Sequence, residues 1–265
     1  MVAATVTPAL EARHLALAWG DDREVARNIN LAIAPGELCC LVGRSGCGKT
    51  TLLHALAGLL VPQSGSVLLH GEDVTGTPGR IGYMLQKDLL LPHKRIVDNV
   101  ALPLVLQGVS RREARARAQE LLARMGLEEV AQSWPSELSG GERQKIAYAS
   151  IWAQHPANLL LDEPTSNLDL TSIDAMTAFV GHAKERGCAI LVAEHRLSWL
   201  ANIADRYVYL EKGSVGRVME AAEFASLDAR EVERMGLRAR STGEIAPRAN
   251  PSVNTDSPRA GDALL

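Results

Sequence analysis

A glycine-rich stretch at residues 43–50 carries the residue types that hold phosphate groups. Its sequence, GRSGCGKT, fits the pattern G-x-x-x-x-G-K-[ST] and directly follows an apolar run. Glycines let successive N–H groups point at a phosphate, and a following helix adds its positive end. Lys49 can reach the β- and γ-phosphates, and the Thr50 hydroxyl can hold Mg²⁺. We therefore expect nucleotide contacts from Gly43, Arg44, Ser45, Gly46, Cys47, Gly48, Lys49, Thr50 and Thr51.

Two adjacent acids, Asp162 and Glu163, follow the apolar run Leu159-Leu160-Leu161. Ligands of open parallel sheets bind beyond the carboxyl ends of the strands. Asp162 is then placed to bind Mg²⁺, directly or through water, and Glu163 to polarise an attacking water. Acids are common at strand ends, so the pair alone is weak evidence. Together with the phosphate loop it indicates phosphoryl transfer, which needs a metal, a phosphate cradle and a base.

A second anion-binding feature lies at Ser139-Gly140-Gly141-Glu142. Ser139 is a good helix N-cap, and the two glycines expose backbone N–H groups at the start of a helix. One small domain has no evident need for two phosphate-facing loops. Two protomers packed head to tail would explain both, because each would cap the nucleotide of the other.

The periodicity around these residues predicts alternating strands and helices. Strands are expected at 14–19, 29–33, 38–42, 66–70, 80–85, 159–161, 190–193 and 207–210, and helices at 49–60, 110–125 and 139–154. Such alternation favours an α/β fold with a mainly parallel sheet. The basic run in 110–125 is interpreted as a solvated helix face rather than a nucleic-acid surface.

Composition sets further limits on the function. The chain has 265 residues, 46% hydrophobic and 22% charged, with a formal net charge of −3. This predicts a globular protein without a global attraction to nucleic acid. Neither a membrane span nor a signal peptide is evident, so we expect a cytosolic protein that serves a membrane only through a partner. Cys39, Cys40, Cys47 and Cys188 form no CxxC pair, which disfavours a zinc site or disulfides.

In their order, these motifs resemble those of the ATP-binding cassette (ABC) ATPases, over roughly residues 10–220. The resemblance assigns further roles. Trp19 stands where the family has an aromatic residue that stacks on adenine, and Gln86 matches the glutamine that contacts Mg²⁺ and the attacking water. Asp169 belongs to the D-loop, and His195 matches the switch histidine that contacts the γ-phosphate.

The resemblance also implies a fold and an assembly. The expected fold is an α/β P-loop NTPase, a RecA-like core with an antiparallel β-region, plus an α-helical signature lobe at about 87–150. A short helical extension at 221–240 should follow. Residues 241–265 are rich in Pro, Ser, Asn and Ala without periodicity, and this composition predicts a disordered tail. Two subunits would sandwich ATP and Mg²⁺ head to tail, as a homodimer or with a paralogue. Integral-membrane permease subunits, and in some systems a substrate-binding protein, would be the partners, at the cytoplasmic face of the membrane.

The branch of the family is less sharply defined. Residues 83–92 and 98–102 look like importers of the nitrate, sulfonate or taurine type, whereas 139–147 and 193–197 look like energy-coupling-factor ATPases. The PTSNLD stretch at 164–169 resembles lipoprotein-release and macrolide-export ATPases. Import is the favoured interpretation. An export or lipoprotein-release ATPase, a soluble ABC ATPase acting on nucleic acid, and a nucleotide switch without turnover remain as alternatives, and the cargo stays open.

Overall fold

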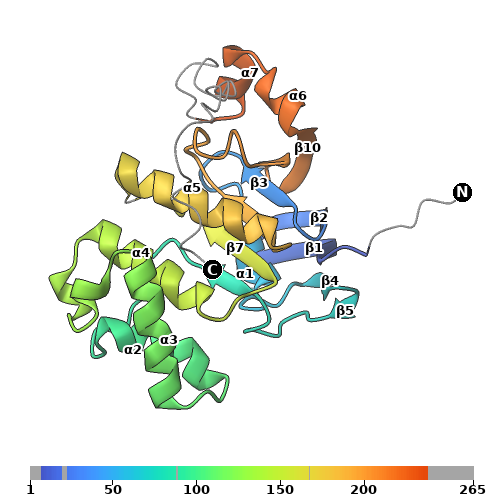
Figure 1. Ribbon diagram of the computed structural model, residues 1–265. Coiled ribbons are helices and arrows are strands. Elements are labelled where there is room, and N and C mark those ends of the chain that lie inside the picture. The colour runs from blue at the N-terminus through green and yellow to red at the C-terminus, as the bar shows by residue number, and fades with distance from the viewer. Residues whose placement is uncertain (1–6, 20–22, 88, 167, 238–265) are drawn as a thin grey trace, which may run out of the picture.

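The computed structural model describes residues 7–19, 23–87, 89–166 and 168–237, and it contains two sheets and a separate group of helices (Figure 1). One sheet has four antiparallel strands in the order β2-β1-β4-β5, and the other has six in the order β10-β9-β3-β8-β7-β6. All neighbours in the larger sheet are parallel except β9 and β10. The expected α/β architecture with a mainly parallel sheet and an antiparallel β-region is confirmed. The tail expected at 241–265 lies outside the described residues.

Strands and helices alternate irregularly along the described part of the chain, with the following bounds. The strands are β1 (Leu10–Trp19), β2 (Arg23–Ile33), β3 (Leu38–Val42), β4 (Ser64–Leu69), β5 (Glu72–Asp73), β6 (Gly82–Met84), β7 (Asn158–Asp162), β8 (Ala189–Ala193), β9 (Arg206–Glu211) and β10 (Ser214–Glu220). The helices are α1 (Lys49–Leu56), α2 (Ile96–Leu106), α3 (Arg111–Arg124), α4 (Gly140–Trp152), α5 (Leu170–Glu185), α6 (Ala221–Ala225) and α7 (Ala229–Arg234). Two 3₁₀ turns lie at Glu128–Val130 and Pro135–Glu137.

The larger sheet is covered on both faces, which explains its unbroken apolar strands. Strands β3, β7 and β8 are buried along their whole length. Successive side chains of β3 belong to different cores, Cys40 to the core beneath α5 and Leu41 to the core around α1. A strand buried on both faces needs no polar alternation. The last residue of β7 is the buried Asp162, and the candidate site lies at this carboxyl end of the strands.

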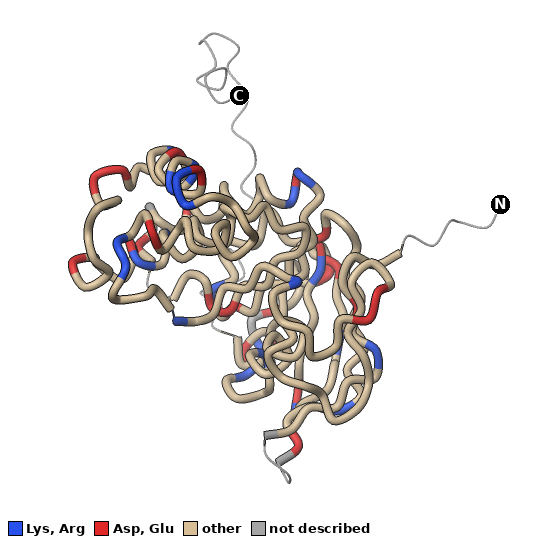
Figure 2. Tube along the Cα trace, turned by 90° about the horizontal axis from the view of Figure 1, so that it is seen from below, with Lys and Arg blue, Asp and Glu red and all other residues tan. Residues whose placement is uncertain are grey.

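Helices α2, α3 and α4 pack around a third apolar cluster that includes Ile96, Ala114, Leu122 and Ile146. Helix α4 also contributes residues to the core of the large sheet and so joins the two regions. The outer face of α3 is solvated, with Arg117 paired to a glutamate on its own helix. Figure 2 shows basic and acidic residues interspersed along the trace. No helix among the described residues is long and apolar enough to cross a bilayer.

Two local departures from the sequence prediction have clear causes. The helix that starts at Lys49 ends at Leu56 rather than at residue 60, because Gly58 adopts a φ of +75° and a Cβ there would lie 2.5 Å from the carbonyl of Thr77. Helix α2 has no counterpart among the predicted elements, because Pro103 lies inside it and proline disfavours the interior of a helix. The expected C-terminal extension forms α6 and α7, as far as residue 237.

Candidate functional site

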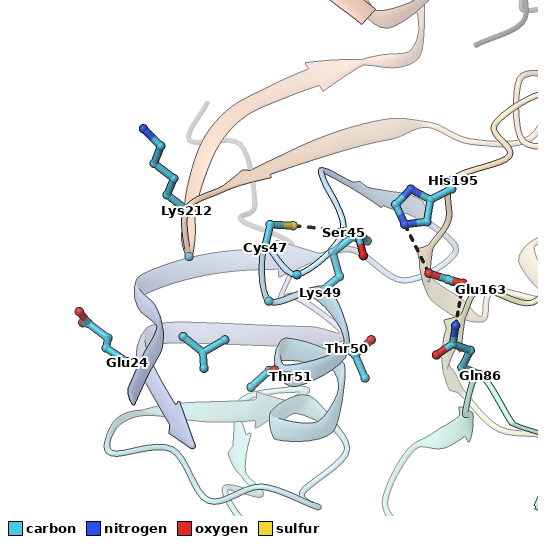
Figure 3. A pocket seen from close by; sticks show the side chains of 14 residues that line it. Glu24, Ser45, Cys47, Lys49, Thr50, Thr51, Gln86, Glu163, His195 and Lys212 are labelled. Carbon is cyan, nitrogen blue, oxygen red and sulfur yellow. Dashed lines mark hydrogen bonds and ion pairs between the residues drawn. The ribbon is translucent and has the colours of Figure 1, made fainter. Parts of the chain in front are cut away.

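The glycine-rich loop joins the end of β3 to the start of α1 and forms one wall of an open cavity of about 500 Å³ (Figure 3). Gly43 has a φ of +154°, and a Cβ there would lie 2.4 Å from the carbonyl oxygen of Leu210, so the backbone approach requires glycine. Gly48 caps α1 in the left-handed region, with a φ of +104°. The loop residues that line the cavity are Ser45, Gly46, Cys47, Gly48, Lys49, Thr50 and Thr51.

The Lys49 ammonium is held inside this loop. It donates to the carbonyl oxygens of Gly43, at 2.9 Å, and Arg44, at 3.2 Å. The thiol of Cys47 lies 4.0 Å from the same ammonium. Burial raises the pKa of Cys47, and the charge of Lys49 opposes this rise only in part. A cation at the base of a loop of N–H groups suits the binding of polyphosphate.

The Arg44 side chain is directed elsewhere. Its guanidinium donates to the carbonyl oxygen of Arg234 at the end of α7, at 3.1 Å, and Arg44 does not line the cavity. A Cβ on Gly236 would lie 2.3 Å from Arg44 Cγ, so the two residues pack closely. Any nucleotide contact from Arg44 therefore belongs to its backbone, while its side chain anchors the C-terminal extension.

Three side chains from distant parts of the sequence, those of Gln86, Glu163 and His195, meet in one cluster (Figure 3). Gln86 Nε2 donates to Glu163 Oε2 at 2.8 Å, and His195 Nε2 lies 3.3 Å from Glu163 Oε1. All three line the cavity. Glu163 has a φ of +47°, and its N–H donates to the Ala193 carbonyl at the end of β8. The three catalytic residues predicted from the sequence are thus brought together at the mouth of the phosphate loop.

Asp162 is buried behind this cluster, with 2% of its surface exposed. Its Oδ2 is buried and has no hydrogen-bond partner in the part of the chain that the structure describes. Burial raises the pKa of Asp162, and a hydrogen bond from the Thr50 hydroxyl opposes this rise. A buried carboxylate oxygen without a donor, next to a hydroxyl, offers the hard oxygen ligands that Mg²⁺ prefers. The residues present therefore fit the predicted metal site.

The second glycine-containing motif starts α4 and does not line the cavity. Ser139 is its N-cap, and its Oγ accepts the N–H of Glu142 at 3.2 Å. Glu142 Oε2 in turn accepts from the Ser139 hydroxyl at 2.7 Å and from its N–H at 2.8 Å, and these bonds lower the pKa of Glu142. The carboxylate of Glu142 thus completes a capping box, while Gly140 and Gly141 stay partly exposed.

Two further residues predicted from the sequence are Asp169, which does not line the cavity, and Trp19. Asp169 caps α5 by accepting the N–H of Ser172 at 2.8 Å. Trp19 is the last residue of β1, and its side chain lies outside the described part of the structure.

The cavity also has lining residues that sequence reasoning missed: Glu24, Val25, Lys212 and Gly213. A Cβ on Gly213 would lie 2.2 Å from the Val25 carbonyl oxygen. The hairpin between β9 and β10 is therefore packed tightly against β2. The glycine in that hairpin was the only local signal that could have pointed to this contact.

Comparison with known proteins agrees with this geometry. Residues 26–166 match the ABC transporter family. The chain is 38% identical over 252 residues to the aliphatic sulfonates import ATP-binding protein SsuB of Cupriavidus necator, covering 89% of this chain and 81% of the relative. It is 41% identical over 202 residues to the lipoprotein-releasing system ATP-binding protein LolD 2 of Caulobacter vibrioides, covering 72% and 88%. A solved dimeric ATP-binding cassette in a post-hydrolysis state, bound to ADP and Pi, superposes with a TM-score of 0.74 at 28% identity, covering 80% of this chain and 98% of that one.

Proposed function

This chain belongs to the ABC transporter family as an ATP-binding, ATP-hydrolysing subunit, and from that premise we propose that it drives the uptake of sulfonated organic anions. The proposal is supported by relatives that are 38% identical and are named for the import of aliphatic sulfonates. The 41% identity to a lipoprotein-releasing ATPase makes release of lipoproteins the second candidate. The nucleic-acid ATPase considered from the sequence has no support among these relatives.

The observation that carries the proposed mechanism is the pair of contacts on the carboxylate of Glu163. Glu163 orients the attacking water and takes its proton, and Gln86 holds the carboxylate and that water in place. His195 reaches the γ-phosphate from the opposite side of Glu163, and Lys49 neutralises phosphate charge. When bound, Mg²⁺ supplies further charge neutralisation, and Thr50, Asp162 and Gln86 are the residues that would hold it.

The motif at the start of α4 acts on the nucleotide of a second subunit. Ser139, Gly140 and Gly141 lie outside the cavity of their own chain, and their N–H groups at a helix start suit an anion. Head-to-tail pairing would carry them onto the partner's γ-phosphate, with Asp169 near the contact between subunits. Trp19 would stack on the adenine ring.

A permease would dock in a second, largely apolar groove beside the catalytic glutamine. It has a volume of about 220 Å³ and lies between the segment after β6, helix α2 and helix α4. Leu102, Pro103 and Ile151 line it, and Leu89 on its rim is 62% exposed. An apolar helix end of a membrane-embedded partner matches this lining. Such docking would hold the chain at the cytoplasmic face of the membrane.

Copurification of this chain with a permease from membranes tests the proposed docking groove. Leu102→Asp, inside the groove, should release the chain from its permease, whereas Leu106→Asp should not, since Leu106 is 79% exposed on the same helix and outside the groove. Equal retention of the two variants would refute the docking site.

A substrate-uptake assay in cells tests which compound the transporter carries. Cells lacking this chain should lose uptake of a labelled alkanesulfonate and regain it with the wild-type chain. Unchanged alkanesulfonate uptake, or copurification with a lipoprotein-releasing membrane subunit, would refute sulfonate import and favour the second candidate.

A further inference from the structure

We propose that Glu194 is a positioning residue that fixes the distance between His195 and Glu163 by tying together the two loops that carry them. The inference rests on the proposed roles of His195 and Glu163. Glu194 follows β8 directly, is 2% exposed and does not line the nucleotide cavity. It therefore cannot act by touching nucleotide, and its effect must pass through its neighbours.

The two carboxylate oxygens of Glu194 serve different loops. Oε1 accepts the N–H groups of His195, at 2.8 Å, and Arg196, at 3.0 Å. Oε2 accepts the hydroxyl of Thr165, at 2.7 Å, and its N–H, at 3.3 Å. Thr165 is fully buried and lies two residues after Glu163. One side chain thus bridges the loop of the histidine and the loop that follows the catalytic glutamate.

These four donors explain how a carboxylate can be buried there. A buried charge is tolerated only when it is hydrogen-bonded, and bonds to a charged acceptor are stronger than neutral ones. Loss of one donor leaves part of this charge uncompensated. The carboxylate therefore holds both loops in one arrangement, because any separation of the loops would break bonds to a buried charge.

Helix α4 joins the same cluster. The Gln144 side chain, 3% exposed, donates to the carbonyl oxygen of Pro164, between Glu163 and Thr165. One turn further on, burial raises the pKa of Tyr148 and the nearby charge of Glu194 raises it further. The helix that begins with Ser139 is thus connected through a few side chains to the catalytic carboxylate. Gln144 from the helical region and Glu194 from the histidine loop thus hold the same segment, residues 164–165.

The hydrogen bonds of Glu194 should affect the rate of ATP hydrolysis more than the affinity for ATP. His195 Nε2 and Glu163 Oε1 are 3.3 Å apart, and each reaches that position from a loop held by Glu194. Catalysis is sensitive to misplacements of about 1 Å, which can cost on the order of a hundredfold in rate. The phosphate loop, by contrast, has no hydrogen bond to Glu194 among the described residues. Cutting the bridge should lower kcat and leave ATP affinity almost unchanged.

Thr165→Val in the full-length chain tests this directly, because it removes the hydroxyl and nearly keeps the shape. We expect kcat for ATP hydrolysis to fall about tenfold, with the KM for ATP within about twofold of wild type. Thr165→Ser should restore kcat to within about twofold. The matched control is Thr177→Val, which removes a hydroxyl that donates to the Ile173 carbonyl inside α5, and it should hydrolyse ATP like wild type.

Glu194→Gln provides a second cut of the same bridge. Its amide oxygen can still accept the N–H groups of His195 and Arg196, but its NH₂ cannot accept the Thr165 N–H, and it can meet the Thr165 hydroxyl only by donating to it. Its kcat should fall in the same way, and the double variant with Thr165→Val should be no slower than Glu194→Gln alone. If Glu194→Gln does not fold, the Thr165 series decides alone.

Two outcomes would overturn the inference. One is a Thr165→Val chain that turns over like Thr177→Val, and the other is a raised KM with an unchanged kcat. His195→Ala separates this failure from a failure of the proposed mechanism. Wild-type turnover in His195→Ala would refute the role of the histidine itself. An inactive His195→Ala together with a fully active Thr165→Val would refute only the bridge.

Discussion

The C-terminal extension contacts the phosphate loop, and one glycine allows that contact to be tested. Arg44, the second residue of the loop, donates to the Arg234 carbonyl and packs on Gly236, which has a φ of +72°. The extension is fixed to the core by Phe224, whose ring stacks on Tyr207 with centroids 3.9 Å apart. Gly236→Ala should therefore disturb the loop from a position outside the nucleotide cavity.

The expected size of the effect follows from two contributions. An alanine held in the left-handed region costs roughly 1–2 kcal/mol. The new Cβ would lie 2.3 Å from Arg44 Cγ and 3.1 Å from Arg44 Nε, so the arginine must move and lose its bond to Arg234. That bond is exposed, which places it at the low end, about 0.5 kcal/mol. Gly126→Ala is the matched control, because Gly126 has a φ of +66° and nothing lies within 4 Å of its Cβ position.

Urea unfolding and equilibrium ATP binding measure the two contributions separately. Both variants should lose about 1–2 kcal/mol of unfolding free energy, and Gly236→Ala about 0.5 kcal/mol more. Only Gly236→Ala should weaken ATP binding, by about twofold if the whole 0.5 kcal/mol is lost from the loop, since 1.4 kcal/mol corresponds to a factor of ten. Arg44→Ala should reproduce the loss of affinity without the backbone strain. Equal ATP affinity in Gly236→Ala and Gly126→Ala would refute the reasoning.

Three further predictions concern single side chains. Lys49→Ala should lose most ATP affinity in equilibrium binding, because the ammonium is the cation held in the loop; unchanged binding would contradict the cradle. Alkylation of Cys47 should be slower at pH 7 than that of a free thiol, and its rate should still increase with pH above pH 9. The reason is that burial raises the pKa of Cys47 and so lowers the fraction of thiolate. An alkylation rate that levels off below pH 8 would count against this. Ser139→Ala and Ser110→Ala should each cost about 1 kcal/mol of unfolding free energy, since both cap helices. Only Ser139→Ala should also slow ATP hydrolysis, and equal activity of the two would argue against the role of that motif.

The sequence predicts those parts of the site in which the residues that act together are neighbours in the chain. The phosphate loop can be identified because its glycines, Lys49 and Thr50 are neighbours in the sequence and together fit a phosphate-binding pattern. The sequence also placed Glu163 at the end of a buried strand. The capping box of Ser139 and Glu142 is visible in the sequence as S-x-x-E, and the structure confirms it, whereas a nucleotide contact of Glu142 stays a prediction.

Other parts depend on contacts that no local pattern encodes. Glu194 reaches Thr165, 29 positions away, and only the parallel pairing of β7 and β8 places their loops side by side. Lys212 and Glu24 line the cavity because the hairpin after β9, which pairs in parallel with β3, packs against β2. The side chain of Arg44 does not line the cavity, and it bonds instead to a carbonyl oxygen of the extension, 190 positions later.

The measurement that bears most directly on the account is the mass of Glu163→Gln in solution, by light scattering, with and without ATP and Mg²⁺. If Glu163 activates the water and two chains enclose the nucleotide, this variant binds ATP, hydrolyses it very slowly and becomes a stable dimer only with ATP. Adding Lys49→Ala to it should abolish the dimer. Brisk hydrolysis by Glu163→Gln, or a chain that stays monomeric with saturating ATP, would contradict the central claim.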